Sequence, residues 1–357
     1  MADLKMKGNH VLEVEDLHTS FATDRGRVDA VNGITFAIDK GGTLGIVGES
    51  GSGKSVASLS ILQLLEGTTA HIRKGQIRFM GQDLLTLSRA QMRKIRGNRI
   101  AMIFQEPMTS LNPTMTIGSQ IAEPIIFHQG KNRRQAWNAA VEMLELVGMP
   151  EPRKRARQYP FELSGGMRQR VMIAIALACG PDVLICDEPT TALDVTIQAQ
   201  ILTLVKRLQR EMGTSIIMIT HDLGVIAETC DFVAVMYCGK IVEYTRAFNL
   251  FTDPKHPYSK GLLESIPSHE EDSDENLKTI EGTVPSPYEL PPGCAFAPRC
   301  PYAKEICHET MPELDGEPEQ KVRCHIYQTT STESPTEGGT VASYIQISDM
   351  WKGEELW

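Results

Sequence analysis

The chain has 357 residues, of which 41% are hydrophobic and 23% are charged, enough for one sizeable core with a smaller part attached. Its formal net charge of −9 gives no basic footprint for DNA or RNA, so we expect no nucleic-acid partner. No apolar run is long enough to span a membrane, and "MADLKMKGNH" does not resemble a secretory signal. We therefore expect a cytosolic protein whose cysteines stay reduced and whose membrane role, if any, comes through a partner.

Short apolar strands alternate with helices along much of the chain, which is typical of a mostly parallel α/β sheet. The alternation stops between about 106 and 180, where helical periodicity predicts a helical insert. We expect strands at 11–17, 31–38, 43–47, 76–80, 100–104, 183–186, 215–219 and 232–236, and helices at 54–65, 88–97, 195–212 and 222–229.

The composition changes near Phe251, where the chain becomes rich in proline and acidic residues. The stretch "SHEEDSDEN" (268–276) is typical of a flexible link. These changes predict a main domain over 1–250, a smaller domain over 251–330 and a polar tail over 331–357.

The stretch "GESGSGKS" fits the pattern G-x-x-x-x-G-K-[ST] and stands between a buried strand and a helix, as a phosphate-binding loop must. Its glycines let backbone N–H groups turn around phosphate oxygens, and the lysine supplies positive charge to the β and γ phosphates. The final serine is a suitable Mg²⁺ ligand. The expected nucleotide-binding residues are Gly48, Glu49, Ser50, Gly51, Ser52, Gly53, Lys54 and Ser55.

Two further motifs point to nucleotide hydrolysis. The apolar strand "VLIC" ends in Asp187 and Glu188, and adjacent acids there can also be ordinary surface residues. The phosphate loop upstream favours Asp187 as a metal partner and Glu188 as the group that acts on water. In "LSGGMRQR", Ser164, Gly165 and Gly166 open an apolar helix, which suits either an anion or a simple N-cap.

These motifs, together with Gln105, the stretch Ala192–Leu193–Asp194 and His221, occur in the order found in ATP-binding cassette (ABC) ATPases. The chain resembles that family over about residues 11–245. The resemblance implies a P-loop NTPase cassette, with a RecA-like core, an N-terminal antiparallel β subdomain and a helical subdomain at about 106–180.

The same resemblance assigns roles to single residues. It implies a head-to-tail pair of cassettes, with ATP held between Gly48–Ser55 of one and Ser164–Gly166 of the other. Glu188 would be the general base, Gln105 the sensor of the γ-phosphate, and His221 the switch that holds the γ-phosphate and the attacking water. Asp194 would link the two sites, and Phe21 is the candidate for adenine stacking, with a core position as the alternative. The implied Mg²⁺ ligands are Ser55, Gln105 and Asp187.

The stretch "LFTDPKHPYSKGLLESIP" (250–267) resembles the extension that follows the cassette in ATPases of oligopeptide, dipeptide and nickel importers. This implies a heterodimer with a second homologous ATPase, two membrane permease subunits that contact the region 106–113, and an external peptide-binding protein. The chain would then lie on the cytoplasmic face of the membrane as a peripheral subunit. Import of nickel or another small solute stays open, as does a soluble ABC ATPase acting on ribosomes, although a single cassette without sustained heptads favours the transporter.

Four of the eight cysteines gather late in the chain, among proline and glycine, in a segment too short to build much core. Four sulfurs suit either Zn²⁺ or an iron–sulfur cluster, and the spacing matches the usual pattern of neither. His308 and His325 keep zinc open because either can replace a sulfur. The permease resemblance implies a [4Fe–4S] cluster, with Cys294, Cys300, Cys307 and Cys324 as its ligands.

Overall fold

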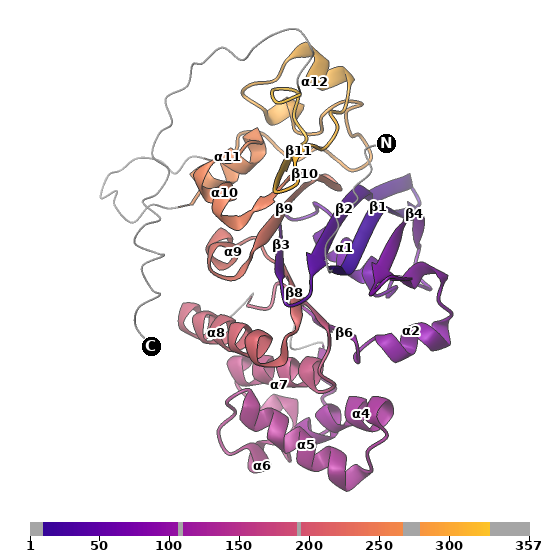
Figure 1. Cartoon of the computed structure of the whole chain (residues 1–357), viewed down its shortest axis with the longest axis vertical. Coiled ribbons are helices and arrows are strands. Elements are labelled where there is room, and N and C mark those ends of the chain that lie inside the picture. The colour runs from indigo at the N-terminus through magenta and orange to yellow at the C-terminus, as the bar shows by residue number, and fades with distance from the viewer. Residues whose placement is uncertain (1–9, 106–109, 191–193, 267–278, 329–357) are drawn as a thin grey trace, which may run out of the picture. The chain divides into compact units, whose positions relative to one another are not determined.

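The structure, a computed structural model, describes residues 10–105, 110–190, 194–266 and 279–328 (Figure 1). The chain forms two compact units, Met1–Ile241 and Val242–Trp357, and each is described by itself. The link expected at 268–276 and the tail expected at 331–357 lie outside the described residues.

An antiparallel sheet opens the first unit, as predicted, with its strands in the order β2-β1-β4-β5. Apolar side chains alternate along β1 and bury one face of the sheet, among them Val11 and Leu17. Strands β1, β2 and β4 are longer than the apolar runs that predicted them. The β1–β2 ladder continues as far as the pair Thr23 and Gly26, and β4 pairs with β1 from Ala70 onward. The strands are β1 (His10–Thr23), β2 (Gly26–Asp39), β4 (Ala70–Phe79) and β5 (Gln82–Asp83).

A parallel sheet forms the centre of the first unit, with its strands in the order β9-β3-β8-β7-β6. Every residue of β3, β7 and β8 is buried, which explains why these strands appear in the sequence as continuous apolar runs. The carboxyl ends of parallel strands meet at one edge, so the residues that follow them emerge together. The strands are β3 (Thr43–Val47), β6 (Ile100–Ile103), β7 (Val183–Asp187), β8 (Ser215–Ile219) and β9 (Phe232–Tyr237).

Helices complete the first unit, and the described part of the predicted insert contains helices joined by turns, with no strand (Figure 1). The helix predicted over 54–65 ends at Ile61, where turns follow. The α-helices are α1 (Lys54–Ile61), α2 (Arg89–Ile95), α4 (Ile117–Gln129), α5 (Arg133–Leu146), α6 (Pro152–Arg155), α7 (Gly165–Leu177), α8 (Val195–Met212) and α9 (Leu223–Thr229). Two 3₁₀ turns are η1 (Leu84–Thr86) and η2 (Pro160–Glu162).

The second unit starts within β10 (Lys240–Arg246), a strand that the sequence patterns did not predict. In this unit β10 pairs with β12 and β12 pairs with β11, both antiparallel. The remaining elements are α10 (Ala247–Thr252), α11 (Pro257–Glu264), η3 (Ala297–Arg299), α12 (Glu305–Glu309), β11 (Asp315–Glu317) and β12 (Gln320–Val322). Within the described residues of both units, no helix has the length and apolar character needed to cross a membrane.

Candidate functional site

The loop between β3 and α1 is packed so closely that two of its glycines cannot be replaced freely. Gly48 has a φ of +150°, and a Cβ on it would lie 2.1 Å from the carbonyl oxygen of Met236. Gly53 has a φ of +101°, and its Cβ would lie 2.3 Å from the carbonyl oxygen of Ala30. The loop is therefore held against the neighbouring backbone, with the N-terminus of α1 at its end.

Lys54 lies inside this loop and is only 6% exposed. Its Nζ donates hydrogen bonds to the carbonyl oxygens of Gly48, at 2.7 Å, and Glu49, at 3.0 Å. Burial lowers the pKa of Lys54, while the nearby carboxylates of Glu188 and Asp187 act in the opposite direction. The positively charged ammonium group of Lys54 thus lies at the centre of the loop.

Ser55 and Asp187 form the second part of the site. The Ser55 hydroxyl donates a hydrogen bond of 3.1 Å to Asp187 Oδ1, which joins the start of α1 to the end of β7. Burial raises the pKa of Asp187, and the hydrogen bond from Ser55 lowers it in part. A hydroxyl and a carboxylate at this spacing are hard oxygen ligands suited to Mg²⁺.

The three expected catalytic residues meet at the carboxylate of Glu188. Its backbone has a φ of +47°, and its N–H donates to the carbonyl of Ile219 at 2.8 Å, so the turn after β7 is fixed against β8. Gln105 Nε2 donates to Glu188 Oε2 at 2.9 Å, and His221 Nδ1 lies 3.4 Å from Glu188 Oε1. Gln105 follows β6 and His221 follows β8, and both therefore contact the carboxylate of Glu188, which follows β7.

The segment "LSGG", called the signature segment, leads into α7 with Ser164 as its N-cap. The hydroxyl of Ser164 accepts a hydrogen bond from the N–H of Met167 at 3.4 Å, as an N-cap does. A Cβ on Gly166 would lie 2.9 Å from Ile197 Cγ2, so the glycine permits close packing against α8. Within the described residues, no hydrogen bond or ion pair joins Ser164–Gly166 to the loop Gly48–Ser55.

Asp194 caps α8, since its Oδ1 accepts a hydrogen bond of 2.9 Å from the N–H of Ile197. Phe21 lies half-buried on β1, opposite Val28 of β2 and Ala70 of β4. The roles expected for both residues, in the dimer and in adenine stacking, stay predictions. Ala192 and Leu193, and residues 106–109 of the expected membrane-subunit contact, lie outside the described residues.

Gln169 supports the catalytic turn, although the sequence patterns did not single it out. It is 1% exposed on α7, and its Nε2 donates a hydrogen bond of 2.5 Å to the carbonyl of Pro189, directly after Glu188. The helix that starts with the signature segment thus supports the turn that carries the carboxylate. Arg168 and Arg170 flank it in the sequence, so no local pattern marks it as buried, and only the structure identifies this contact.

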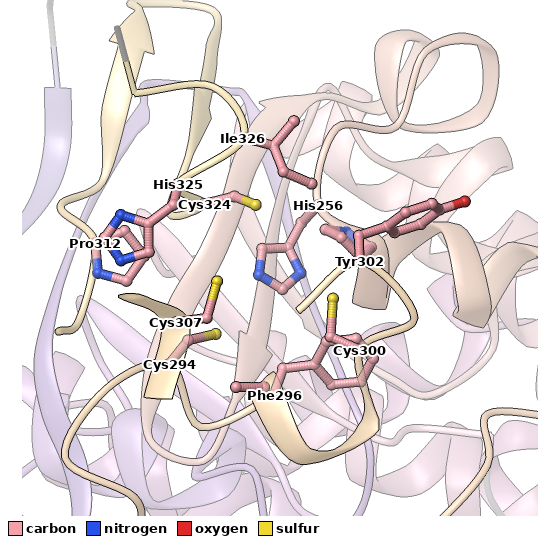
Figure 2. Close-up of a pocket in the computed structure, with 12 residues that line it drawn as sticks. His256, Cys294, Phe296, Cys300, Tyr302, Cys307, Pro312, Cys324, His325 and Ile326 are labelled. Carbon is pink, nitrogen blue, oxygen red and sulfur yellow. The ribbon is translucent and has the colours of Figure 1, made fainter. Parts of the chain in front are cut away.

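The four late cysteines line one cavity in the second unit, and this cavity is partly open to solvent. Figure 2 shows their side chains directed into this space, together with the ring of His256. The other lining residues include Phe296, Tyr302, Pro312, His325 and Ile326. The structure therefore brings Cys294, Cys300, Cys307 and Cys324 together, as the sequence predicted.

The thiols in this cavity lie near enough to affect one another. Burial raises the pKa of Cys324 to about 11, and the charges of the other three cysteines contribute in the same direction. Burial also raises the pKa of Cys294, and the buried guanidinium of Arg323 nearby lowers it in part. Among the described residues, however, no three His, Cys, Asp or Glu side chains are arranged to hold a metal ion.

Two family models match the chain: "ABC transporter" over residues 31–191 and "Oligopeptide/dipeptide transporter, C-terminal region" over residues 242–307. The chain is 50% identical to the oligopeptide transport ATP-binding protein AppD of Bacillus subtilis (strain 168), over 90% of this chain and 98% of AppD. It is 54% identical to OppD of the same organism, another oligopeptide transport ATP-binding protein, over 85% of each chain. It is 52% identical to the dipeptide transport ATP-binding protein DppD of that organism, over 85% of this chain and 90% of DppD.

Solved structures of other ATP-binding cassettes have a fold similar to that of this chain. The ATP-binding cassette MJ0796, a dimer in a post-hydrolysis state bound to ADP and Pi, has a TM-score of 0.60 and 26% identity, covering 66% of this chain and 98% of that one. The protein cbiO1 from Clostridium perfringens, part of the ABC transporter complex cbiONQ, has a TM-score of 0.58 and 26% identity, covering 68% and 91%. The chain belongs to the ATP-binding subunits of the oligopeptide and dipeptide ABC transporters.

Proposed function

We propose that this chain hydrolyses ATP to drive the import of dipeptides and oligopeptides through a membrane transporter. The observation that carries the proposal is the meeting of Gln105 and His221 at the carboxylate of Glu188, in a chain that also matches the C-terminal region of peptide transporters. The names of AppD, OppD and DppD as transport ATP-binding proteins support the same substrate class.

In this proposal the loop binds the phosphates of ATP. Its backbone N–H groups and the N-terminus of α1 face the anion, and Lys54 exchanges the carbonyls of Gly48 and Glu49 for phosphate oxygens. Ser55, Asp187 and Gln105 would hold Mg²⁺, which would offset the negative charge of the phosphates.

Glu188 acts as the general base in hydrolysis. Its carboxylate is 17% exposed, so it can meet a water from the solvent side while Gln105 and His221 orient it. The water loses its proton to Glu188 as its oxygen attacks the γ-phosphorus, and the bond to the β-phosphate oxygen breaks. His221, 66% exposed, is free to turn toward the γ-phosphate and the attacking water.

The complete site is proposed to need two cassettes. Ser164–Gly166 of a second, homologous ATPase would close over ATP held by Gly48–Ser55, and Asp194 would link the two sites. The region 106–113 would contact one of two membrane permease subunits, which receive peptide from an external binding protein. The chain would then be a peripheral subunit on the cytoplasmic face of the membrane.

The experiment is uptake in a strain that lacks this chain and needs an amino acid supplied as a peptide. Complementation with the wild-type gene is expected to restore growth and uptake of labelled peptide, and Glu188→Gln is expected to restore neither. Glu142→Gln, which alters an exposed carboxylate on α5, serves as the matched control. Uptake of labelled nickel without peptide uptake would favour the alternative cargo and overturn the proposal.

We also propose that Cys294, Cys300, Cys307 and Cys324 hold a [4Fe–4S] cluster. Their shared cavity and the mutual effect on their pKa values support a common ligand for the four thiols. Zn²⁺ is the alternative occupant, because four thiolates also suit a single tetrahedral zinc ion.

The test of the cluster is anaerobic purification followed by measurement of iron, sulfide, zinc and visible absorbance. A broad band near about 400 nm with iron and sulfide in equal amounts is expected. A colourless protein with stoichiometric zinc would show that the thiols hold zinc instead.

A further inference from the structure

His256 is the residue whose ring joins the cysteine cavity to the start of α11. It is 1% exposed and lines the cavity with the four thiols (Figure 2). Its Nδ1 accepts a hydrogen bond of 3.0 Å from the N–H of Tyr258, as an N-cap does. An imidazole nitrogen that accepts from an N–H carries no proton, so the proton of the neutral ring lies on Nε2.

The other side of the ring reaches the chain next to the last cysteine. The ring of His256 is placed to hydrogen-bond the backbone of Arg323, and only Nε2–H is available to donate to its carbonyl. Arg323 is fixed twice more, because its N–H donates to the carbonyl of Val242 at 2.8 Å and its guanidinium donates to the carbonyl of Pro312 at 3.0 Å. The residue directly before Cys324 is therefore held from three sides.

The backbone of His256 is anchored as firmly as its ring. Glu243, fully buried on β10, accepts hydrogen bonds of 2.8 Å from the N–H groups of Lys255 and His256. Glu243 pairs with Val322 in the β10–β12 ladder, two residues before Cys324. The same strand thus positions both the histidine and the last cysteine.

The ring also contacts the loop that carries the first two cysteines. Phe296, between Cys294 and Cys300, lies with its ring centroid 5.8 Å from that of His256 and 5.4 Å from that of Tyr258. Phe296 is 2% exposed, so this contact is part of the core of the second unit. His256 consequently contacts the loop that carries Cys294 and Cys300, and it lines the cavity together with Cys324.

We propose that His256 is a positioning residue: its Nε2–H holds the Arg323 carbonyl so that Cys324 faces the other three thiols and is protected from solvent. The consequence for metal binding rests on the proposed cluster, whereas the positioning of the thiol does not. A cluster needs all four sulfurs at once, so loss of this hydrogen bond should weaken its retention.

Two substitutions separate the two nitrogen atoms of the ring. His256→Asn keeps an oxygen near the place of Nδ1 and can still cap α11, but it has no donor that reaches Arg323. His256→Gln places an amide N–H near the position of Nε2 and gives up the cap. The first readout is the rate at which iodoacetamide alkylates Cys324 in the metal-free full-length protein, followed by peptide mass spectrometry, with thermal unfolding of each variant as the folding control.

In the wild type Cys324 is 8% exposed and should react slowly. Alkylation is expected to be about tenfold faster in His256→Asn, because a buried carbonyl loses its donor, and to return toward the wild-type rate in His256→Gln. Equal rates in the wild type and His256→Asn would overturn the proposal, and so would equal acceleration in both variants, since that would assign the effect to the cap.

The second readout is the loss of iron from reconstituted protein to a chelator. If the wild type takes up a cluster, His256→Asn is expected to lose it about tenfold faster than His256→Gln. If the wild type takes up no cluster while alkylation follows the expected order, the cluster assignment fails and the positioning role of His256 stands. Cluster retention and alkylation that are both insensitive to His256→Asn would refute the role.

Discussion

The substitution Gly48→Ala should damage the phosphate loop far more than Gly51→Ala, although both add one methyl group to the same loop. The new Cβ at position 48 would lie 2.1 Å from the Met236 carbonyl oxygen and 2.9 Å from Ser52 Oγ, at a φ of +150°. The conformational strain costs on the order of 1–3 kcal/mol, and the overpacking adds a similar amount. At Gly51 the φ is +80° and no atom lies within 4 Å of the Cβ, so only about 1–2 kcal/mol of strain is expected.

The assay is urea unfolding of the two variants and the wild type, followed by circular dichroism, together with ATP binding. Gly48→Ala is expected to lower the free energy of unfolding by about 2 kcal/mol more than Gly51→Ala, and to weaken ATP binding because the loop must move away from Met236. Equal losses of stability in the two variants would show that the contact with the Met236 carbonyl imposes no constraint on residue 48, contrary to this prediction.

Two further predictions concern the interior of the first unit. Gln169→Leu should lower ATP turnover roughly tenfold with little change in ATP affinity, because the Pro189 carbonyl loses its donor and the turn that carries Glu188 loosens; steady-state kinetics would check this, and unchanged turnover would contradict it. Cys186 and Cys230 should resist alkylation in the folded protein at mildly alkaline pH and react only on unfolding. Burial raises the pKa of Cys230 to about 12 and raises that of Cys186 as well, so alkylation of either in the native state at the rate of a free thiol would contradict the packing around them.

Much of the site could be predicted because its residues follow strands that are buried on both faces. Continuous apolar runs mark β3, β7 and β8, and the residues after them meet at one edge of the sheet. Motifs that are far apart in the chain therefore lie in contact, as Gln105 does with Glu188 and Ser55 with Asp187.

Other features depend on tertiary contacts that leave no pattern in the sequence. The strand β10 was missed because Glu243 interrupts its apolar run, and that carboxylate accepts hydrogen bonds from the N–H groups of Lys255 and His256, which belong to another element. Local patterns cannot show that partner. The role of Gln169 likewise depends on a carbonyl that reaches it from another element. The thiols could be predicted to gather, but their spacing alone could not exclude a zinc site.

ATP turnover by Glu188→Gln in the assembled transporter measures the catalytic role of Glu188. The substitution keeps an acceptor for Gln105 and removes only the base, so ATP binding should persist while turnover falls by at least about 100-fold. Glu142→Gln, prepared in parallel, should hydrolyse ATP at the wild-type rate. Wild-type turnover in Glu188→Gln would contradict the role of Glu188 and with it the catalytic site described for this chain.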